Sequence, residues 1–403
     1  MTEAMSDQSS TIDSTSPVRV IPSDASQPGP QPGGGLCLSG GGYRAMVFHA
    51  GVLWRLNQAG YVRKLDRISS VSGGSITAGV LGLRWQRLAF DANGVAQAYE
   101  SEVVAPVREL ASRTIDAKAV IGGVLLPGSV ADRVADAYRK YLFGSATLQD
   151  LPDAPRFVIN ATNVQSGALW RFAKPYMADY RVGIVQNPRI ELAIAVGASS
   201  AFPPVLSPVE LELDEGAFAP GSGTDLQREP YTTNVVLTDG GVYDNLGLET
   251  VWKNYQTVFV SDGGGKTEAE PEPAGDWAQH SLRVLNLIDN QVRSLRKRQV
   301  IDSFKAGAAA MKANNPKALT PRAHGSGRIG VFAPTSARLA NTLPAPHART
   351  MALAAIPTRL KRLEREEQER LINWGYAVCD AALRAHVEPT LPRVTFPYPR
   401  AGV

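Results

Sequence analysis

The stretch LCLSGGGYRAMVFHAGVLWRL, residues 36–56, joins a short apolar run to a helical pattern through three glycines. The apolar run at 36–39 predicts a strand, and the periodicity that follows predicts a helix over 43–59. A helix start has unpaired backbone N–H groups and the positive end of the helix dipole, so this junction predicts an anion-binding loop. The residues expected to form it are Gly40, Gly41, Gly42 and Arg44, whose charge either faces the anion or braces the loop.

The strand–helix pattern then repeats, with RISSVS at 67–72 as the second strand and 74–88 as the second helix. This alternation favours an α/β fold whose mainly parallel sheet is covered by helices on both faces. Further strands are predicted at 156–162, 168–174, 234–237 and 257–261, and further helices at 97–112, 130–142, 245–253, 279–304 and 358–386. We find no internal repeat, and expect a disordered tail over residues 1–33 and one domain over 34–400.

Composition narrows the class of protein. The 403 residues are 44% hydrophobic and 20% charged, with a net charge of only +4, which indicates a packed globular protein and predicts no nucleic-acid partner. The sequence has no signal peptide and no apolar run of the ~18 to 20 residues that a membrane span needs. The two cysteines, Cys37 and Cys379, form no disulfide framework. We therefore expect a soluble cytoplasmic protein, and the sequence indicates no oligomeric state.

Three anions would suit the glycine loop: a dinucleotide pyrophosphate, a nucleotide phosphate or the oxyanion of an acyl transfer. Gly40-x-Gly42-x-x-Ala45 matches a dinucleotide fingerprint, but the acidic residue that would bind the ribose should close the next strand, and Asp66 precedes that strand. No P-loop pattern is present. The oxyanion is therefore the leading expectation, and a dinucleotide-binding enzyme is the weaker alternative.

The second strand ends in SVSGG, a pattern that favours a nucleophile on a sharp strand-to-helix turn. Such a turn needs small residues two places before and after the nucleophile. Ser72 meets this requirement with Ser70 and Gly74, whereas Ser70 or Ser75 as the central residue does not. The N–H of Gly73 could help to bind an oxyanion. Because the first two strands of a parallel sheet commonly lie side by side, the glycine loop is expected beside Ser72.

A serine nucleophile needs a base, and Asp239 is the favoured candidate because it follows an apolar strand and precedes Gly240 and Gly241. Asp262, in a second Asp-Gly-Gly, competes less well because it opens into an acidic loop. The Ser, Asp, His order of an α/β-hydrolase is formally available, but we expect surface or structural positions for the histidines. These are His49, His280, His324, His347 and His386.

These motifs resemble those of the patatin-like phospholipases: a glycine-rich oxyanion loop followed by arginine, a GxSxG elbow and an Asp-Gly-(Ala/Gly). The segment 195–209, AVGASSAFPPVLSPV, is similar to a further stretch of that family, and the resemblance spans 34–378. It implies a three-layer α/β acyl hydrolase with a Ser72/Asp239 dyad, no histidine and no cofactor or metal. Ser70 stands where the elbow pattern has its first glycine, a change that resembles the freedom seen in related cytosolic phospholipases, and Ala45 stands at the last position of GxGxxG.

The resemblance implies a lipid acyl-ester substrate, of the phospholipid or lysophospholipid type, and allows peripheral membrane contact. Two segments are candidates for that contact. The basic run at 292–300 is either a membrane-binding surface or an ordinary solvated helix face, and the apolar segment 120–128 is either a buried turn or an exposed lid. The alternative function is a catalytically silent or activator-gated lipid-binding relative.

Overall fold

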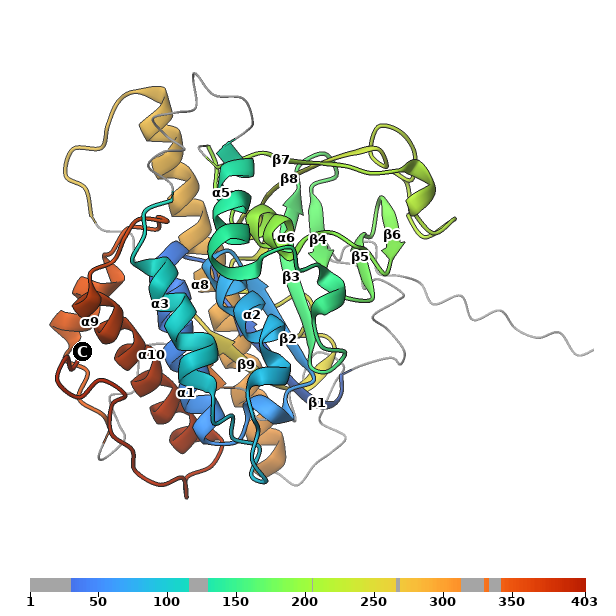
Figure 1. Cartoon of the computed structure of the whole chain (residues 1–403). Helices are drawn as coiled ribbons and strands as arrows, with labels where there is room; N and C mark the ends of the chain where they lie inside the picture. Colours follow the sequence, from blue (N-terminus) through green and yellow to red (C-terminus); the bar gives the residue numbers. More distant parts are fainter. Residues whose placement is uncertain (1–29, 116–129, 205, 266–268, 313–329, 333–341) are drawn as a thin grey trace, which may run out of the picture.

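The computed structural model describes residues 30–115, 130–204, 206–265, 269–312, 330–332 and 342–403 (Figure 1). The strands are β1 (Gln31–Leu38), β2 (Arg67–Val71), β3 (Arg156–Asn163), β4 (Ala168–Phe172), β5 (Tyr176–Asp179), β6 (Gly183–Gln186), β7 (Val209–Glu212), β8 (Asn234–Asp239), β9 (Tyr255–Ser261) and β10 (Gly330–Phe332). The helices are α1 (Gly42–Gln58), α2 (Gly73–Leu83), α3 (Ala105–Ala111), α5 (Val130–Tyr138), α6 (Leu192–Ser199), α7 (Gly241–Asp244), α8 (Trp277–Lys312), α9 (His347–Ala354) and α10 (Arg365–His386).

All of these strands belong to one sheet, whose main path has the order β10-β9-β1-β2-β3-β4-β5-β6. The pairs from β10 to β3 are parallel, and β4, β5 and β6 extend the sheet in antiparallel pairing. Strands β7 and β8 lie off the main path, with β8 pairing antiparallel to β3. The parallel part confirms the expected α/β fold, and β1 and β2 are neighbours as predicted.

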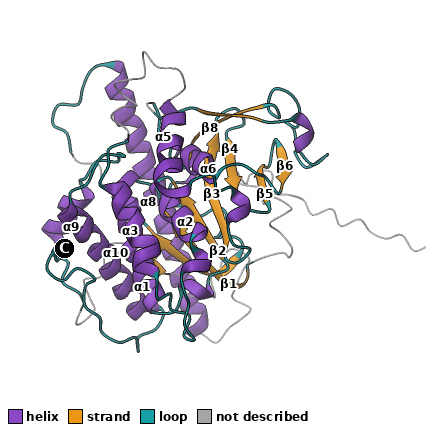
Figure 2. Ribbon diagram, viewed as in Figure 1, coloured by secondary structure: helices purple, strands orange, loops and turns teal. Residues whose placement is uncertain are grey.

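Helices cover both faces of the parallel strands because the side chains of each strand alternate between the faces. In β1, Leu36 and Leu38 join the large apolar core that includes residues of α1, α2 and α10, while Cys37 joins a second cluster that includes Val300 of α8. Figure 2 shows the strands between α1, α2 and α3 on one side and α8 on the other. The result is the three-layer arrangement that the sequence predicted.

Several boundaries differ from the sequence predictions. β1 begins at Gln31, inside the predicted tail, because Gln31 and Gly34 pair with β9. Residues 245–253 form turns rather than a helix, since the Asp244 carboxylate accepts hydrogen bonds from the N–H groups of Leu246 and Glu249. The apolar segment 120–128 lies outside the described residues.

The predicted span 97–112 divides into a π-helical turn, Glu100–Val104, followed by α3. The sequence did not predict α6, β5, β6 or β7. Within the described part of the chain, no helix combines the length and the apolar character needed to cross a membrane.

Candidate active site

Ser72 occupies a strained turn between β2 and α2. Its φ of 50° and ψ of −121° are rare for a residue with a side chain, and such a conformation costs on the order of 1–3 kcal/mol. The turn requires glycine at the next position, because a Cβ on Gly73 would lie 2.1 Å from the carbonyl oxygen of Gly42. This contact also places the glycine loop directly against the turn. A strained strand-to-helix turn of this kind is the geometry that a nucleophile elbow requires.

Asp239 reaches the elbow from an unexpected direction. β2 runs parallel to β3 and its Val71 is opposite Asn160, whereas β8 runs antiparallel to β3 and its Asp239 is opposite Ala161. Because β4 occupies the other edge of β3, β2 and β8 lie along the same edge and meet with their carboxyl ends together. Ser72 and Asp239 therefore converge on two adjacent residues of β3.

The Asp239 carboxylate is buried, and only one of its two oxygens accepts a hydrogen bond among the described residues. Its Oδ1 accepts the Gly241 N–H at 2.7 Å, while no hydrogen-bond partner meets Oδ2 among the described residues. Burial raises the pKa of Asp239 to about 7; the Gly241 N–H and the Ser72 hydroxyl lower it and the nearby Asp289 raises it. A carboxylate with a pKa near neutrality and one open oxygen beside a serine hydroxyl has the properties of a general base.

Hydroxyl groups support the elbow from behind. Ser199, at the end of α6, accepts the Ser72 N–H at 2.9 Å and donates to the Asn160 carbonyl at 2.6 Å. Ser75 Oγ lies 2.9 Å from Ser199 Oγ and 3.0 Å from Ser70 Oγ. Ser70, at a position where the family pattern has glycine, thus fits by joining a buried hydroxyl network.

The glycine loop divides into an anchor and potential donors. The Gly40 N–H donates to the carbonyl and the side-chain oxygen of Asn245, at 3.0 and 3.1 Å, so it is already occupied. The N–H groups of Gly41, Gly42 and Gly73 meet no acceptor among the described residues, as expected at helix starts. Of these donors, Gly73 belongs to the Ser72 turn and the Gly42 backbone lies directly against it.

Close packing explains two other small residues of the site. A Cβ on Gly74 would lie 2.5 Å from the Leu38 carbonyl oxygen, and one on Gly240 would lie 2.3 Å from that of Asn160. Both positions therefore exclude side chains for steric reasons.

Arg44 braces the loop instead of facing an anion. Its Nε donates to the Gly263 carbonyl at 3.2 Å, and its other nitrogens donate to Ile356 and Thr358. Burial and the charge of Arg293 lower the pKa of Arg44 to about 10, so the guanidinium remains charged at neutral pH. Of the two roles open from the sequence, bracing is the one that these contacts support.

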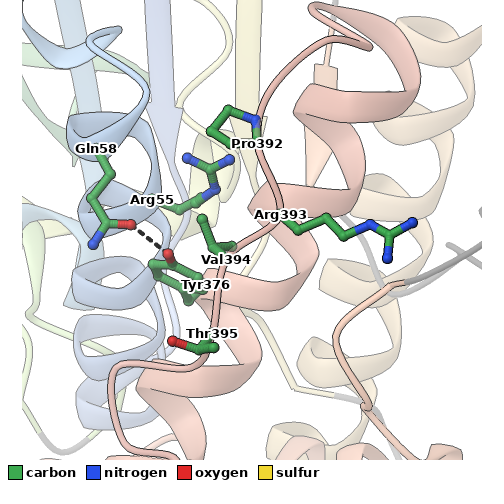
Figure 3. A pocket seen from close by; sticks show the side chains of 7 residues that line it. All are labelled: Arg55, Gln58, Tyr376, Pro392, Arg393, Val394 and Thr395. Atoms are coloured by element: carbon green, nitrogen blue, oxygen red, sulfur yellow. Dashed lines mark hydrogen bonds between the residues drawn. The ribbon is translucent and has the colours of Figure 1, made fainter.

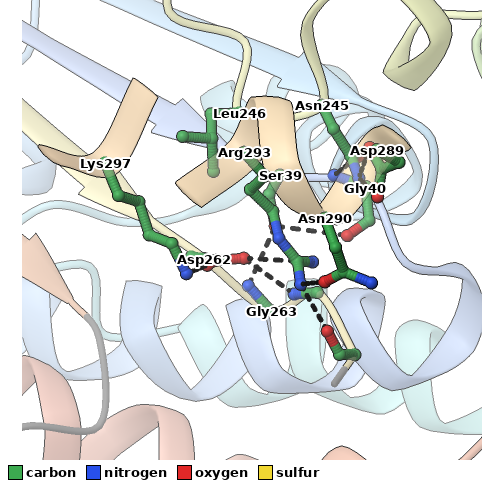
Figure 4. A network of polar contacts seen from close by, with 12 residues as sticks. Ser39, Gly40, Asn245, Leu246, Asp262, Gly263, Asp289, Asn290, Arg293 and Lys297 are labelled. Carbon is green, nitrogen blue, oxygen red and sulfur yellow. Dashed lines mark hydrogen bonds and ion pairs between the residues drawn. The ribbon is translucent and has the colours of Figure 1, made fainter. Parts of the chain in front are cut away.

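Asp262, the competing aspartate, is paired with cations (Figure 4). Its Oδ2 lies 2.8 Å from the Lys297 ammonium, and its Oδ1 lies 3.8 Å from the Arg293 guanidinium. Burial alone would raise the pKa of Asp262, but Arg293 and Lys297 outweigh it and hold the pKa below the ordinary value. Asp262 is therefore a structural anion and a poor proton acceptor.

We expect Asp262→Asn to lower the free energy of unfolding at pH 7 by about 3 kcal/mol, because it leaves Arg293 and Lys297 without their buried counter-charge. Urea unfolding followed by fluorescence measures this loss. Since the pKa of Asp262 is lowered in the folded state, the loss should shrink as the pH falls through that pKa. An unchanged or increased stability would contradict this role.

The same contacts engage most of the charge in the basic run at 292–300. Arg293 and Lys297 face Asp262, and Arg296 lies 2.7 Å from Glu249 and 3.7 Å from Asp244. Only Arg298, among the four basic residues of this run, is exposed. Arg293, Arg296 and Lys297 thus lie on the inner, ion-paired side of α8.

The described histidines make no hydrogen bond to Ser72 or Asp239. His49 is buried between Ser261 Oγ, at 2.8 Å from Nδ1, and the Ser39 carbonyl, at 2.9 Å from Nε2. Burial lowers the pKa of His49 to about 4, so the ring is neutral and structural. His280, His347 and His386 lie on α8, α9 and α10, and His324 lies outside the described residues.

The acid required by the dinucleotide alternative is at the wrong end of the sheet. The Asp66 carboxylate accepts the Gly34 N–H at 2.7 Å, before β2 begins and away from the carboxyl ends where the glycine loop lies. No group of three metal-binding side chains occurs in the ranges that the structure describes.

An open cavity of about 420 Å³ lies apart from the elbow, between α1, α10 and residues 392–395 (Figure 3). It is lined by Arg55, Gln58 and Tyr376, among others, and Arg55 is paired with the buried Asp380 at 2.9 Å. Arg55 is 13 positions beyond Gly42 on α1, or roughly 20 Å along the helix. This cavity takes no part in the candidate site.

The sequence reasoning missed three supporting residues. Asn245 anchors Gly40, and its Nδ2 donates to Asp289 of α8 at 3.0 and 3.2 Å. Ser199 holds the elbow N–H. Only Ser199 had a signal, since it lies in the segment 195–209 that resembles the family; a role for Asn245 or Asp289 depends on contacts between distant parts of the chain.

The family model described as "Patatin-like phospholipase" matches residues 36–252, more than half of the chain. No match was found among curated proteins.

Among solved structures, human GIVD cytosolic phospholipase A2 is similar over 88% of this chain and 61% of its own, with 12% identity and a TM-score of 0.45. The same human enzyme in complex with methyl gamma-linolenyl fluorophosphonate and terbium chloride has 14% identity, 88% and 58% coverage and a TM-score of 0.47. VipD from Legionella pneumophila has 15% identity, 89% and 68% coverage and a TM-score of 0.35. The chain thus spans about three-fifths of the length of the human enzyme.

Proposed function

The chain belongs to the patatin-like phospholipase family, and on this premise we propose that it is a serine hydrolase of lipid fatty-acyl esters with Ser72 as nucleophile and Asp239 as general base. The observation that carries the proposal is the meeting of β2 and β8, which brings a serine in a strained turn to a buried carboxylate with one open oxygen. Phospholipids and lysophospholipids are the substrate classes that we propose.

In the first step, Ser72 Oγ attacks the ester carbonyl carbon while its proton passes to Asp239 Oδ2. The carbonyl oxygen becomes an oxyanion, for which the N–H groups of Gly41, Gly42 and Gly73 are the available donors. One such donor typically contributes about 2.7–4 kcal/mol to lowering the barrier. Gly40 serves as the anchor of the loop through Asn245.

The tetrahedral intermediate then collapses. The bond to the alcohol oxygen breaks, the departing alcohol takes the proton from Asp239, and an acyl group remains on Ser72. In the second step Asp239 accepts a proton from water, the resulting hydroxide attacks the acyl carbonyl, and Ser72 recovers its proton as the fatty acid leaves. Asp239 thus acts as base and acid in turn, for which a pKa of about 7 is well matched.

The pH dependence of fatty-acid release tests this proposal. Because the pKa of Asp239 is raised to about 7 and the ionised form is the active one, kcat/KM for a soluble p-nitrophenyl ester should rise about tenfold per pH unit below 7 and level off above it. The same limb should appear for fatty acid released from phosphatidylcholine or lysophosphatidylcholine. A limb near pH 4 would contradict Asp239 as the base. Binding of lipid without hydrolysis of any ester would favour the catalytically silent or gated alternative.

A further inference from the structure

The exposed apolar residues of this protein are concentrated on one helix. Among the described residues, ten large apolar side chains are exposed, and eight of them belong to α8. These eight are Trp277, Val284, Leu285, Leu287, Ile288, Val292, Leu295 and Ile301. Trp277 is 83% exposed, and Ile288 is 55% exposed. Such a concentration on one surface element marks an interaction site.

An ordinary surface helix buries its apolar side chains and exposes its charged ones, whereas α8 exposes an apolar stripe and turns charged side chains inward. Val284, Ile288, Val292 and Leu295 follow helical spacing and form an outward stripe, with Trp277 and Leu285 close to it. The stripe defined by Asp289, Arg293, Lys297 and Val300 faces the protein, where it binds Asn245 and Asp262 and packs on the sheet. We call the outward stripe, with Trp277 and Leu285, the apolar face of α8.

The apolar face borders the side of α8 that contacts the candidate active site, because Leu285 is one helical turn before Asp289. Asp289 accepts hydrogen bonds from Asn245, which anchors Gly40 (Figure 4). α7 packs against α8, and its Val242 lies three residues after Asp239. Val242 is 57% exposed and is one of the two exposed large apolar residues that the structure describes outside α8. α7 thus adds one exposed apolar side chain beside α8, three residues after the residue that we propose as the base.

The charges around the apolar face favour a neutral or zwitterionic partner. Three of the basic residues of α8 are held by internal carboxylates, while Arg298 and Lys305 are exposed, with the exposed Asp302 between them. Arg283 is paired with Glu270 at 3.2 Å, and the exposed Glu272 and Asp276 lie close in sequence to Trp277. This acidic character near Trp277 is unfavourable for nucleic acid or strongly anionic lipid.

We propose that the apolar face of α8, together with Val242, docks onto a neutral or zwitterionic lipid surface. This inference rests on the proposed function, since a lipid acyl hydrolase must take its substrate from an aggregate of lipids. Insertion of Trp277 and the aliphatic stripe at such a surface would hold Ser72 near the acyl chains. The driving force is burial of apolar area, so salt should have little influence on it.

The test compares wild type with the triple variant Val284→Gln, Ile288→Gln and Leu295→Gln, and with the control Val164→Gln. Val164 lies just after β3, outside α8. It is 56% exposed, so, like the test residues, it is an exposed aliphatic side chain. Partitioning onto phosphatidylcholine vesicles is measured by co-sedimentation in 0.1 and 0.5 M NaCl. Each protein is also assayed with a soluble p-nitrophenyl ester, and its fold is checked by circular dichroism. The single variant Ile288→Gln serves if the triple variant does not fold.

We expect the triple variant to bind vesicles at least about tenfold more weakly and to lose activity on vesicle lipid in proportion, while its rate on the soluble ester stays within twofold. Val164→Gln should behave as wild type, and salt should change wild-type binding less than twofold. Unchanged vesicle binding by the triple variant would overturn the proposal. A second result would also overturn it: wild type binds no vesicles and is a dimer in analytical ultracentrifugation, and the triple variant is a monomer. This face would then be a contact between copies of the chain. Wild type that binds vesicles through this face but cleaves no ester would support the docking surface and refute the proposed function.

Discussion

Ser72→Ala is expected to lower kcat/KM for ester hydrolysis by at least about 10⁴-fold. The substitution removes the oxygen that attacks the carbonyl, and loss of the nucleophile in a serine hydrolase leaves only the contributions of binding and of the oxyanion donors. The folded structure should survive, because the Ser72 N–H that binds Ser199 is retained and the side chain becomes smaller. Initial rates with a p-nitrophenyl ester and fatty-acid release from a phospholipid measure the effect.

Ser75→Ala is the matched control. Ser75 is a buried serine three residues along the same helix start, and its hydroxyl contacts Ser70 and Ser199. Its loss should cost about 1 kcal/mol of stability and change kcat/KM by less than tenfold. If Ser75→Ala abolished activity while Ser72→Ala retained it, the nucleophile would be Ser75 and not Ser72.

Asp239→Asn should lower kcat/KM by about 10³-fold, within the range of 10²–10⁴ that general-base catalysis contributes. The amide keeps the size of the side chain and can still accept the Gly241 N–H, but it cannot take the proton of Ser72. The residual rate should lose the limb near pH 7. If Asp239→Asn and wild type had equal kcat/KM at all pH values, Asp239 could not be the base.

The same substitution should make the protein more stable. The carboxyl has an ordinary pKa of 3.8 and a pKa of about 7 in the folded state, so ionisation opposes folding as the pH rises between these values. At pH 8 Asp239→Asn should raise the free energy of unfolding by up to about 4 kcal/mol, with a smaller gain at pH 5. Urea unfolding at both pH values measures the difference. A gain that does not depend on pH would show that the buried carboxylate is not the cause.

The two Asp-Gly-Gly aspartates thus make opposite predictions. Among the residues that the structure describes, no cation contacts the open oxygen of Asp239, which destabilises the fold when ionised. Asp262 is held by Lys297 and Arg293 and stabilises the fold. A substitution that lowers activity and raises stability identifies a carboxylate whose ionisation costs folding free energy but serves catalysis.

Local features of the fold could be predicted from the sequence. The junction of β1 with α1 and the turn at Ser72 depend on short runs of apolar and small residues, whose patterns are complete within about 20 residues. The adjacency of β1 and β2 followed from the rule that consecutive strands of such a sheet are neighbours. The sequence therefore predicts that the glycine loop and the elbow lie together.

Long-range features could not be predicted in this way. The sequence indicated that Asp239 ends a strand, but not that β8 runs antiparallel to β3 and meets β2 end to end. The basic run on α8 looked solvated because its partners, Asp262 and Glu249, lie about 30 to 50 residues away in the chain. Which face of an amphipathic helix is buried depends on the charges already present on the surface that it covers.

The central claim is that Ser72 is an activated nucleophile, and intact mass after reaction with a fluorophosphonate serine probe tests it most directly. Wild type should gain the mass of one phosphonyl adduct, Ser75→Ala should gain the same adduct, and Ser72→Ala should gain none. An adduct that persists in Ser72→Ala, or no adduct on correctly folded wild type, would contradict the account.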